Sequence, residues 1–356
     1  MKVAVSLVGL RTPRMTGVER YSLELVRSLL ELDSGIEIVP IVHRWAADQL
    51  DVDAIVVPDY LSRVVATEIW LPWQLSAGGF DLVHFTCFGA PHLLRTPFVL
   101  SVLDLVSWDL PATMSRGNRW YFRPLMNAAL KKRNLKAVVS LADSTATEVA
   151  QRWALRVPVV GSPPGISGEW FANPDHDRPQ DGPLRILTVG TLEPRKGTNV
   201  IASAARLLLE MGIHFEWTLV GRSGWGGVEL PRCVVLCDGV LDGELRAMYQ
   251  AVDVLVAPSF MEGFDLPVAE ALAAGTSVIA SNIPVHVEHF GSTVSLFTAG
   301  DGRSLADCLA QRVGVVNRVE DQVGRIECVR KFGWATTAST VVQLWQMVST
   351  PNISDG

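Results

Sequence analysis

Apolar strand-like segments alternate with helical ones along this chain, and the alternation begins twice. In the first half, strands are expected at 2–8, 36–42, 81–85, 98–103 and 137–141, with a helix at 18–32. In the second half, strands are expected at 185–189, 215–220, 233–237, 252–257 and 276–280, with helices at 198–211, 243–251 and 267–274. Such alternation predicts parallel sheets with helices on both faces. The expected fold class is α/β, with two doubly wound domains.

The boundary between the domains is expected in residues 158–183, which are rich in proline, glycine, aspartate and asparagine and lack periodicity. We place the first domain at 1–165 and the second at 166–335. The remaining segment, 336–356, contains an apolar helix that should dock on the protein. Ligands of doubly wound sheets bind beyond the carboxyl ends of the strands. Between two such domains, the cleft is therefore the natural site.

Composition and charge narrow the classes of function. Of the 356 residues, 48% are hydrophobic and 19% are charged, as in a globular protein with ample core. A net charge of -6 argues against strong nonspecific affinity for nucleic acid. No apolar run approaches the roughly 18 residues that span a bilayer, and residues 1–9 form a strand pattern without a signal-peptide cleavage site. A cytoplasmic protein with reduced cysteines is the simplest inference.

The segment 259–270 combines an anion-binding turn with two carboxylates. It follows a strand and opens a helix, with Pro267 where a first-turn proline is favoured and Gly275 where a helix commonly ends. Backbone N–H groups at such a helix start bind anions, phosphate above all. Glu262 and Glu270 bracket the turn, and a carboxylate inside the helix suits neutral hydroxyls such as a ribose diol. The segment indicates a site for a phosphorylated sugar or nucleotide; the alternative is a loop with a capping acid.

A second segment, 190–197, also lies between a strand and a helix and carries the adjacent cations Arg195 and Lys196. Guanidinium and ammonium groups at the mouth of a cleft can neutralise a diphosphate leaving group. The alternative is a solvated pair on a loop, but the anion-binding turn at 263–266 favours the functional interpretation. Glycine-containing turns are expected at the ends of strands, at Gly17, Gly190, Gly221 and Gly263.

Sequence motifs for a bound cofactor are absent. The run Gly-Arg-Ser-Gly-Trp-Gly-Gly at 221–227 matches neither the dinucleotide fingerprint nor a Walker loop. Among the seven histidines, His286 and His289 lie close together, and we expect a surface or supporting role for them rather than a metal site. Neither a cofactor nor a metal is therefore expected.

Over residues 190–335 this chain resembles the C-terminal domain of family 4 retaining glycosyltransferases of the GT-B fold. The resemblance is carried by the stretches VGTLEPRKG, LVGRSGWG, ELRAMYQAVDVLVAPS, EGFDLPVAEALAAGTSVIASNIPVHVE and FGWATTA. It is looser in the first half, through 17–21, 81–85 and 137–147. The nearest members in character are bacterial mannosyl- and rhamnosyltransferases of polysaccharide assembly. The resemblance implies two Rossmann-like domains facing across a cleft, with the last helix packed back on the first domain.

The resemblance also implies an activity and a set of site residues. The protein would move a hexose or 6-deoxyhexose from a nucleoside-diphosphate sugar to a glycan, lipid-linked or small-molecule acceptor, without a metal. In the family's E-x7-E motif the first glutamate lies beside the transferred sugar and the second holds the ribose, while the cation pair grips the diphosphate. The implied catalytic residues are Glu262, Arg195 and Lys196. The implied donor-binding residues are Gly17, Gly190, Thr191, Gly221, Arg222, Leu241, Gly263, Phe264, Asp265, Leu266 and Glu270. The implied acceptor or sugar-pocket residues are Leu103, Asp104, His84 and Arg20.

Two residues depart from the family pattern. Leu103 stands where the family commonly has the histidine of V-x-H-D-L, which typically faces the donor sugar near its 6-hydroxyl. We expect Leu103 to line a pocket for a 6-deoxyhexose, because an apolar wall leaves a hydroxyl unpaired; altered or lost activity is the rival explanation. Asp265 stands where the family usually has glycine. We expect its side chain to cap the helix, with Arg195 and Lys196 offsetting its charge.

Basic and aromatic residues crowd one segment of the first domain, namely Arg116, Arg119, Trp120, Tyr121, Phe122, Arg123, Lys131, Lys132, Arg133 and Lys136. Such a surface suits anionic lipid or a lipid-linked acceptor, and equally suits a solvated helix face. Peripheral association with the inner face of a membrane is therefore left open.

Two other classes of protein fit part of the pattern. One is a sugar-nucleotide epimerase or phosphorylase of the same fold; a phosphorylase should also show a pyridoxal-phosphate lysine, and none is evident. The other is a non-catalytic protein that binds sugar nucleotides or glycans, which the leucine at 103 would support. The presence of Glu262 and Glu270 together with Arg195 and Lys196 favours the enzyme, because structure alone does not require this combination.

Overall fold

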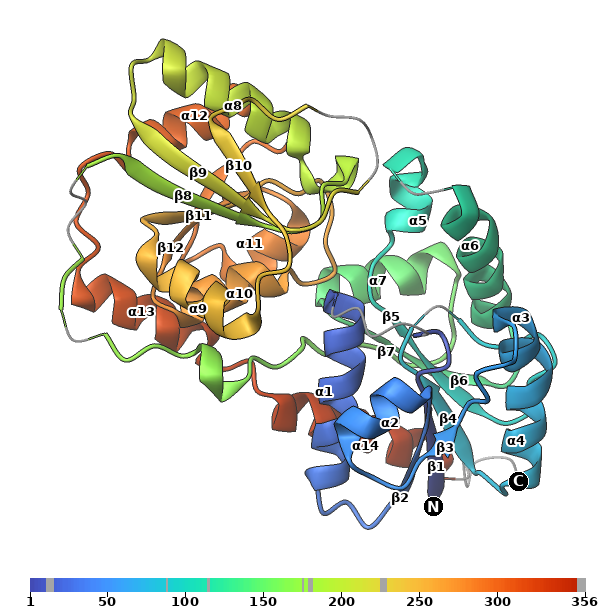
Figure 1. Cartoon of the computed structure of the whole chain (residues 1–356). Helices are drawn as coiled ribbons and strands as arrows, with labels where there is room; N and C mark the ends of the chain where they lie inside the picture. The colour runs from blue at the N-terminus through green and yellow to red at the C-terminus, as the bar shows by residue number, and fades with distance from the viewer. Residues whose placement is uncertain are drawn as a thin grey trace. The chain divides into compact units, whose positions relative to one another are not determined.

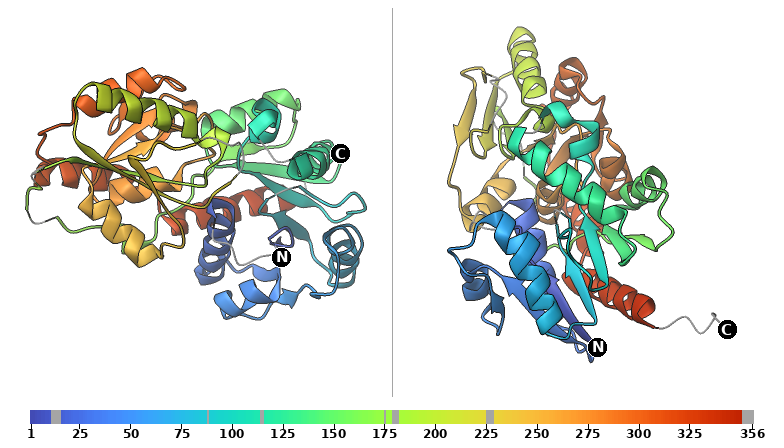
Figure 2. Two further views of the ribbon diagram at one scale, coloured as in Figure 1. Left: turned by 45° about the horizontal axis from the view of Figure 1, so that its top comes forward. Right: turned by 90° about the vertical axis from the view of Figure 1, so that its right-hand side faces the viewer.

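The computed structural model describes residues 1–10, 16–87, 89–113, 116–174, 176–178, 182–224 and 229–350, without the side chains of 116–122. The chain divides into two compact units (Figure 1). Unit 1 comprises Met1–Gly165 and Gly333–Gly356, and unit 2 comprises Ile166–Phe332. Each unit has one parallel sheet with helices on both faces (Figure 2). The prediction of two Rossmann-like α/β domains is confirmed.

Unit 1 is built on a seven-stranded sheet in the order β3-β2-β1-β4-β5-β6-β7. The strands are β1 (Lys2–Ser6), β2 (Glu37–Val42), β3 (Ile55–Val56), β4 (Leu82–Phe85), β5 (Phe98–Val102), β6 (Leu135–Ser140) and β7 (Val159–Gly161). The helices are α1 (Gly17–Glu31), α2 (Arg44–Leu50), α3 (Arg63–Val65), the π-helical η1 (Ala66–Trp70), α4 (Leu71–Ala77), α5 (Val106–Asp109), the 3₁₀ turn η2 (Pro111–Thr113), α6 (Arg116–Leu130), α7 (Asp143–Arg152) and α14 (Trp334–Ser349).

The last helix, α14, belongs to unit 1 although it follows unit 2 in the sequence. It begins at Trp334, two residues before the expected start of the segment, and its Trp345 is fully buried. The Trp345 ring meets the imidazole of His84 edge-on, with centroids 5.6 Å apart. At its other end, Trp334 lies against Tyr21 of α1, with ring centroids 6.2 Å apart. The apolar character of α14 is explained by these contacts, because burying its tryptophan side chains against unit 1 stabilises the docked helix.

Unit 2 is built on a six-stranded sheet in the order β10-β9-β8-β11-β12-β13. The strands are β8 (Leu184–Val189), β9 (Phe215–Val220), β10 (Val234–Cys237), β11 (Val254–Ala257), β12 (Ser277–Ser281) and β13 (Ser295–Phe297). The helices are α8 (Thr198–Glu210), α9 (Asp242–Ala251), α10 (Leu266–Ala273), α11 (Pro284–Phe290), α12 (Gly302–Ala310) and α13 (Val319–Arg330), with 3₁₀ turns η3 (Gly168–Trp170) and η4 (Pro194–Lys196).

The core of unit 2 lies between the sheet and the helices α8 and α12. Ile186, Trp217 and Val254 of the sheet pack with Leu208 of α8 and Leu305 of α12, all of them almost fully buried. β8 pairs with β9 on one side and with β11 on the other, so the direction of winding reverses between β8 and β11. In open α/β sheets this reversal opens a crevice at the carboxyl ends of the strands, where ligands bind.

Differences from the expected elements lie mostly in short or peripheral segments. The pattern did not predict the strands β3, β7 and β13 or, in unit 2, the helices α11, α12 and α13. Strands of two or three residues carry too little alternation to recognise. The predicted end of α10 is confirmed: Gly275 has a φ of 76°, and the Thr276 N–H donates to the Ala271 carbonyl. Among the described residues, no helix is both long and apolar enough to span a bilayer.

Candidate functional site

Two glycines pack the loops at the carboxyl edge of the unit 2 sheet tightly together. Gly197, which ends η4, has a φ of 70°, and a Cβ there would lie 2.1 Å from the Pro258 carbonyl oxygen. Gly221 follows β9, and a Cβ there would lie 2.0 Å from the carbonyl oxygen of Gly190. Only glycine fits such close backbone approaches. The loops after β8, β9 and β11 are thereby held against one another.

The three residues predicted to be catalytic meet at this edge. The Lys196 Nζ lies 2.7 Å from Glu262 Oε1, and the Arg195 Nη1 lies 3.3 Å from Glu262 Oε2. Arg195 also pairs through Nε with Glu193 Oε2 at 3.0 Å. The Phe260 N–H donates to the Arg195 carbonyl at 2.8 Å, which ties the two loops together through the backbone. Both cations thus lie where the winding of the sheet reverses.

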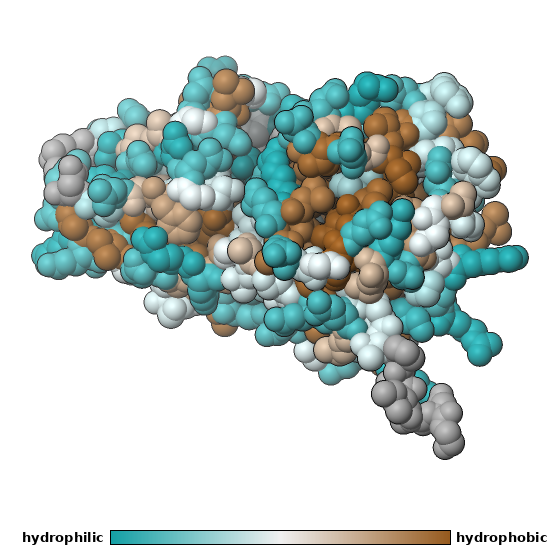
Figure 3. Space-filling model, turned by 90° about the horizontal axis from the view of Figure 1, so that it is seen from below, coloured by the Kyte–Doolittle hydropathy of each residue, from teal (hydrophilic) through white to brown (hydrophobic). Residues whose placement is uncertain are grey.

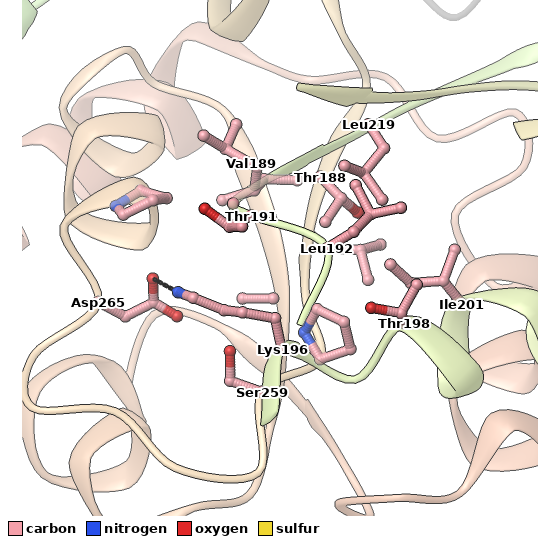
Figure 4. A pocket seen from close by; sticks show the side chains of 16 residues that line it. Thr188, Val189, Thr191, Leu192, Lys196, Thr198, Ile201, Leu219, Ser259 and Asp265 are labelled. Carbon is pink, nitrogen blue, oxygen red and sulfur yellow. Dashed lines mark ion pairs between the residues drawn. The ribbon is translucent and has the colours of Figure 1, made fainter. Parts of the chain in front are cut away.

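The side chains of Lys196 and Asp265 point toward each other across a small pocket (Figure 4). Their Nζ and Oδ1 atoms are 3.9 Å apart. The pocket is lined by the ends of β8 and β11, including the hydroxyl-bearing residues Thr191 and Ser259. α10 begins directly after Asp265, so the positive end of its dipole lies at the same place. The arrangement offers cations, hydroxyls and a helix N-terminus to an anionic ligand.

Burial and charge act in opposite directions on the ionisation of this cluster. Burial lowers the pKa of Lys196, but the carboxylates of Glu262 and Asp265 outweigh it and raise the pKa above its ordinary value. Burial raises the pKa of Asp265, but Lys196, His286 and Arg195 outweigh it and hold the pKa below its ordinary value. Lys196 and Asp265 are therefore both charged at neutral pH.

The prediction that the Asp265 side chain caps α10 is wrong. Asp265 occupies the N-cap position with a φ of 75° and a ψ of 73°, and its side chain makes no cap hydrogen bond. A capping residue normally has extended backbone, which aims its side chain at the first turn. In the left-handed conformation the carboxylate instead reaches the Nε2 of His286 at 3.0 Å. Of the two roles expected for His286, surface or supporting, the structure shows the supporting one, since His286 is fully buried on α11 and contacts Asp265.

Glu270, the second glutamate of the motif, lies in the middle of α10 and is 5% exposed. Its Oε2 accepts a hydrogen bond from the Tyr249 hydroxyl of α9 at 3.0 Å. Tyr249 is itself fully buried and meets Trp170 edge-on, with ring centroids 6.0 Å apart. The packing of Tyr249 therefore fixes the direction of the Glu270 carboxylate.

The remaining predicted donor residues of unit 2 differ in how they are placed. Gly190 and Thr191 line the pocket beside Lys196. Arg222 lies at the end of β9, with its Nε 3.6 Å from an Asp238 carboxylate oxygen. Leu241 precedes α9 and is 71% exposed. The residues at the start of α10 differ in burial, since Gly263 and Phe264 are buried and Leu266 is half-buried.

Phe264 does not present its side chain to a ligand. Its ring packs against Phe290, Phe332 and His289, with centroids 5.4, 5.1 and 5.0 Å apart. It is 2% exposed, so any contribution to donor binding comes from its backbone. The ring anchors the loop between β11 and α10 in the core.

The predicted acceptor residues lie in unit 1, as does Gly17, which was predicted to bind the donor. Gly17 is the first residue of α1 rather than a turn at a strand end, and Arg20 lies on the same helix. Leu103 and Asp104 directly follow β5, where the Asp104 Oδ1 accepts a hydrogen bond from the Val106 N–H at 3.0 Å. These four residues are partly or fully exposed.

The prediction that His84 lines an acceptor pocket is wrong. His84 lies within β4 and is fully buried, with its Nε2 2.9 Å from the Ser101 Oγ. Burial lowers its pKa to about 3, so it is neutral at physiological pH. A histidine enclosed between its strand and Trp345 belongs to the core of unit 1.

The roles of two site residues, His286 and Tyr249, could not be predicted from their spacing in the sequence. His286 lies 21 residues beyond Asp265, and Tyr249 lies 21 residues before Glu270, so each pair forms only through the fold. The position of His286 was one clue, because it lies in the first helix after β12, five residues beyond that strand, in a sheet whose strand ends carry the other site residues. Among the described residues, no group of three or more histidines, cysteines, aspartates and glutamates is arranged to hold a metal ion.

Comparisons with known proteins agree with this architecture. Residues 183–313 match the family model of glycosyl transferases group 1. MMP alpha-(1->4)-mannosyltransferase of Mycolicibacterium hassiacum is 25% identical over 303 residues, covering 76% of this chain and 71% of the relative. Phosphatidyl-myo-inositol mannosyltransferase of Mycobacterium leprae is 29% identical over 293 residues, covering 77% and 75%. The crystal structure of Anabaena HepE in complex with UDP-glucose has a TM-score of 0.71 at 15% identity, covering 98% of this chain and 100% of that chain.

The family match lies in unit 2, and the solved structure shows the GT-B fold over nearly the whole chain. This chain carries a group 1 glycosyl transferase domain within unit 2, and its homologues include mannosyltransferases. The resemblance found in the sequence is confirmed.

Proposed function

We propose that unit 2 binds a nucleoside-diphosphate sugar and that the protein transfers the hexose or 6-deoxyhexose with retention of anomeric configuration. The observation that carries the proposal is the convergence of Arg195, Lys196 and Glu262 beside the N-terminus of α10, where the sheet reverses its winding. UDP-glucose bound to the Anabaena protein, which shares this fold, is in keeping with a donor of this type.

The chemistry needs these charges. The bond between the anomeric carbon and the diphosphate breaks, so negative charge grows on the leaving group while the sugar gains oxocarbenium character. Arg195, Lys196 and the α10 N-terminus would stabilise the leaving group, and Glu262 would lie beside the sugar. Glu270 would accept the ribose hydroxyls, next to the Tyr249 hydroxyl that orients it. In this account the fixed cations do the work of a metal ion, and none is required.

A nucleotide-binding assay tests the proposal. We expect UDP, GDP or dTDP, or one of their sugars, to raise the unfolding temperature, because a ligand at a hundred times its Kd adds about 2.7 kcal/mol. Lys196→Gln should weaken that binding at least about tenfold, because a charge-assisted bond to phosphate is lost. Lys136→Gln, which removes an exposed lysine of unit 1, is the control. The proposal fails if no nucleotide stabilises the wild type or if Lys196→Gln binds as well as the wild type.

We propose that Leu103 influences which donor sugar is preferred. The relatives are named mannosyltransferases, whereas an apolar Leu103 would favour a 6-deoxyhexose such as rhamnose. Transfer and hydrolysis should be compared with activated mannose, glucose and rhamnose in the wild type and in Leu103→His. We expect the wild type to prefer the deoxy sugar and Leu103→His to shift the preference toward mannose. A wild-type preference for a 6-hydroxylated donor would remove the role of Leu103.

The acceptor would bind unit 1, and a lipid-linked acceptor at an anionic membrane is the version we propose. Hydrophobic residues gather on the part of unit 1 seen from below in Figure 3. On the helices α3 to α4, the side chains of Val64, Ile69 and Trp73 are more than half exposed. Lys131 and Arg133, which lie between α6 and β6, and Lys136, near the start of β6, are also exposed. Co-sedimentation with anionic but not neutral liposomes is expected, and its absence would leave a soluble acceptor.

The competing classes are less well supported. Both mannosyltransferase relatives are named as transferases, which favours neither an epimerase nor a non-catalytic binding protein. Conversion of the nucleotide sugar to an epimer in the absence of any acceptor would favour an epimerase instead.

A further inference from the structure

His286 has a hydrogen-bond acceptor at each of its ring nitrogens. The Nδ1 lies 2.9 Å from the Ser281 carbonyl oxygen, and the Nε2 lies 3.0 Å from the Asp265 Oδ2. A carbonyl and a carboxylate can only accept, so both ring nitrogens must donate. A neutral imidazole carries one N–H, and the two contacts together require the doubly protonated imidazolium. The site is fully buried, so water cannot replace either contact.

Without this proton the cluster would have an excess of negative charge. Arg195 and Lys196 face three carboxylates, those of Glu193, Glu262 and Asp265. A diphosphate that enters next to Lys196 would be repelled by the buried Asp265. At an effective dielectric constant of about 20, one unit charge at 6–10 Å changes the affinity of an anion roughly ten- to hundredfold.

We propose that His286 is a positioning residue of the donor site, an inference that rests on the proposed function. His286 carries a proton that neutralises the charge of Asp265, so that Lys196 can bind the diphosphate. His286 acts through Asp265 and does not touch the donor. The remaining charged groups near this pair do not replace it. On α11 itself, His289 Nε2 lies 3.9 Å from Glu288 Oε1, and the His289 ring packs in the Phe264 aromatic group.

The same contacts give Asp265 a purpose that glycine could not serve. Its Oδ1 faces Lys196 at 3.9 Å while its Oδ2 receives the His286 proton. Lys196 therefore has a second anchor besides Glu262. When Glu262 turns to the sugar, Asp265 keeps the ammonium group in place without leaving net negative charge beside the diphosphate.

Charge compensation can be separated from packing by a rescue experiment. The dissociation constants of UDP and GDP are measured by calorimetry for the full chain. His286→Gln leaves Asp265 ionised and uncompensated, so we expect nucleotide affinity to fall about tenfold or more. Asp265→Asn removes the charge, and its amide can donate to a neutral His286, so we expect affinity within about threefold of wild type. The double variant removes both charges and should recover to within about threefold of wild type.

A purely structural role for His286 predicts a different pattern. The double variant would then bind as weakly as His286→Gln or more weakly, and that result overturns the proposal. His92→Gln makes the same substitution at an exposed histidine of unit 1 and should stay within about threefold of wild type. A loss of affinity in His92→Gln equal to that in His286→Gln also counts against the proposal.

A measurement on the wild type covers the case in which His286→Gln does not fold. Two-bond ¹H–¹⁵N correlation spectra distinguish an imidazolium from either neutral tautomer, and His286 should show the imidazolium pattern at pH 7. A neutral ring with a bare Nε2 would overturn the proposal. Failure of the donor site itself would look different, because the wild type would then bind neither nucleotide or Lys196→Gln would bind as well as wild type.

Discussion

Asp265 has a backbone conformation that few aspartates adopt, and its function follows from that conformation. The sequence placed it correctly at the start of a helix, because Pro267 and the apolar run after it mark that start. Sequence alone does not give φ, so the extended conformation of an ordinary N-cap was the natural expectation. With a φ of 75° the carboxylate leaves the helix end and pairs with His286. A tertiary contact thus replaced the local one.

The close packing around Gly197 predicts how much an alanine substitution there would destabilise the protein. A Cβ at Gly197 would clash with the Pro258 carbonyl, whereas Gly212 has nearly the same φ, 71°, and no heavy atom within 4 Å of an added Cβ. Gly212→Ala should cost only the strain of the left-handed conformation, about 1–2 kcal/mol. Gly197→Ala adds a backbone clash and should lower the free energy of unfolding by about 3 kcal/mol or more. Denaturant titration of both variants checks this; equal costs would contradict the close approach of the two loops.

At the scale of elements, the contact between α14 and β4 explains the burial of His84. The sequence showed an apolar C-terminal helix but not which strand its tryptophan would cover. The family resemblance also implied a place for His84 in the acceptor or sugar pocket. The structure encloses the imidazole beneath Trp345, and its pKa falls to about 3. Periodicity predicts elements well, but it does not predict which element covers which.

This burial should make unit 1 sensitive to mild acid. Because the folded pKa of His84 lies below the unfolded value of about 6.5, the unfolded state binds the extra proton between these values. The stability present above pH 6.5 is therefore lost as pH falls, by about 2 kcal/mol between pH 7 and pH 5. Urea titrations at the two pH values should show this loss in the wild type and a smaller one in His84→Gln. His92→Gln, at an exposed histidine, should behave as the wild type.

At the scale of the whole molecule, the fold could be predicted further than the site. The strand–helix alternation, which begins twice in the sequence, predicted two doubly wound sheets. Because ligands bind at the carboxyl ends of such strands, the loops after β8 and β11 were the expected site. Glu262, Arg195 and Lys196 were found in this way, and they lie together. The residues that orient Asp265 and Glu270, namely His286 and Tyr249, come from neighbouring helices at no fixed spacing, so no sequence pattern identifies them. The acceptor side in unit 1 rests on resemblance alone.

The central claim is that Arg195 and Lys196 hold the diphosphate of a sugar nucleotide, with Glu270 on the ribose. A crystal structure of the protein with its best-binding nucleoside diphosphate tests this most directly. We predict diphosphate oxygens within hydrogen-bonding distance of Arg195 and Lys196, and ribose hydroxyls within hydrogen-bonding distance of Glu270. A nucleotide bound at another part of the chain, without contacts to Arg195, Lys196 or Glu270, would contradict the account.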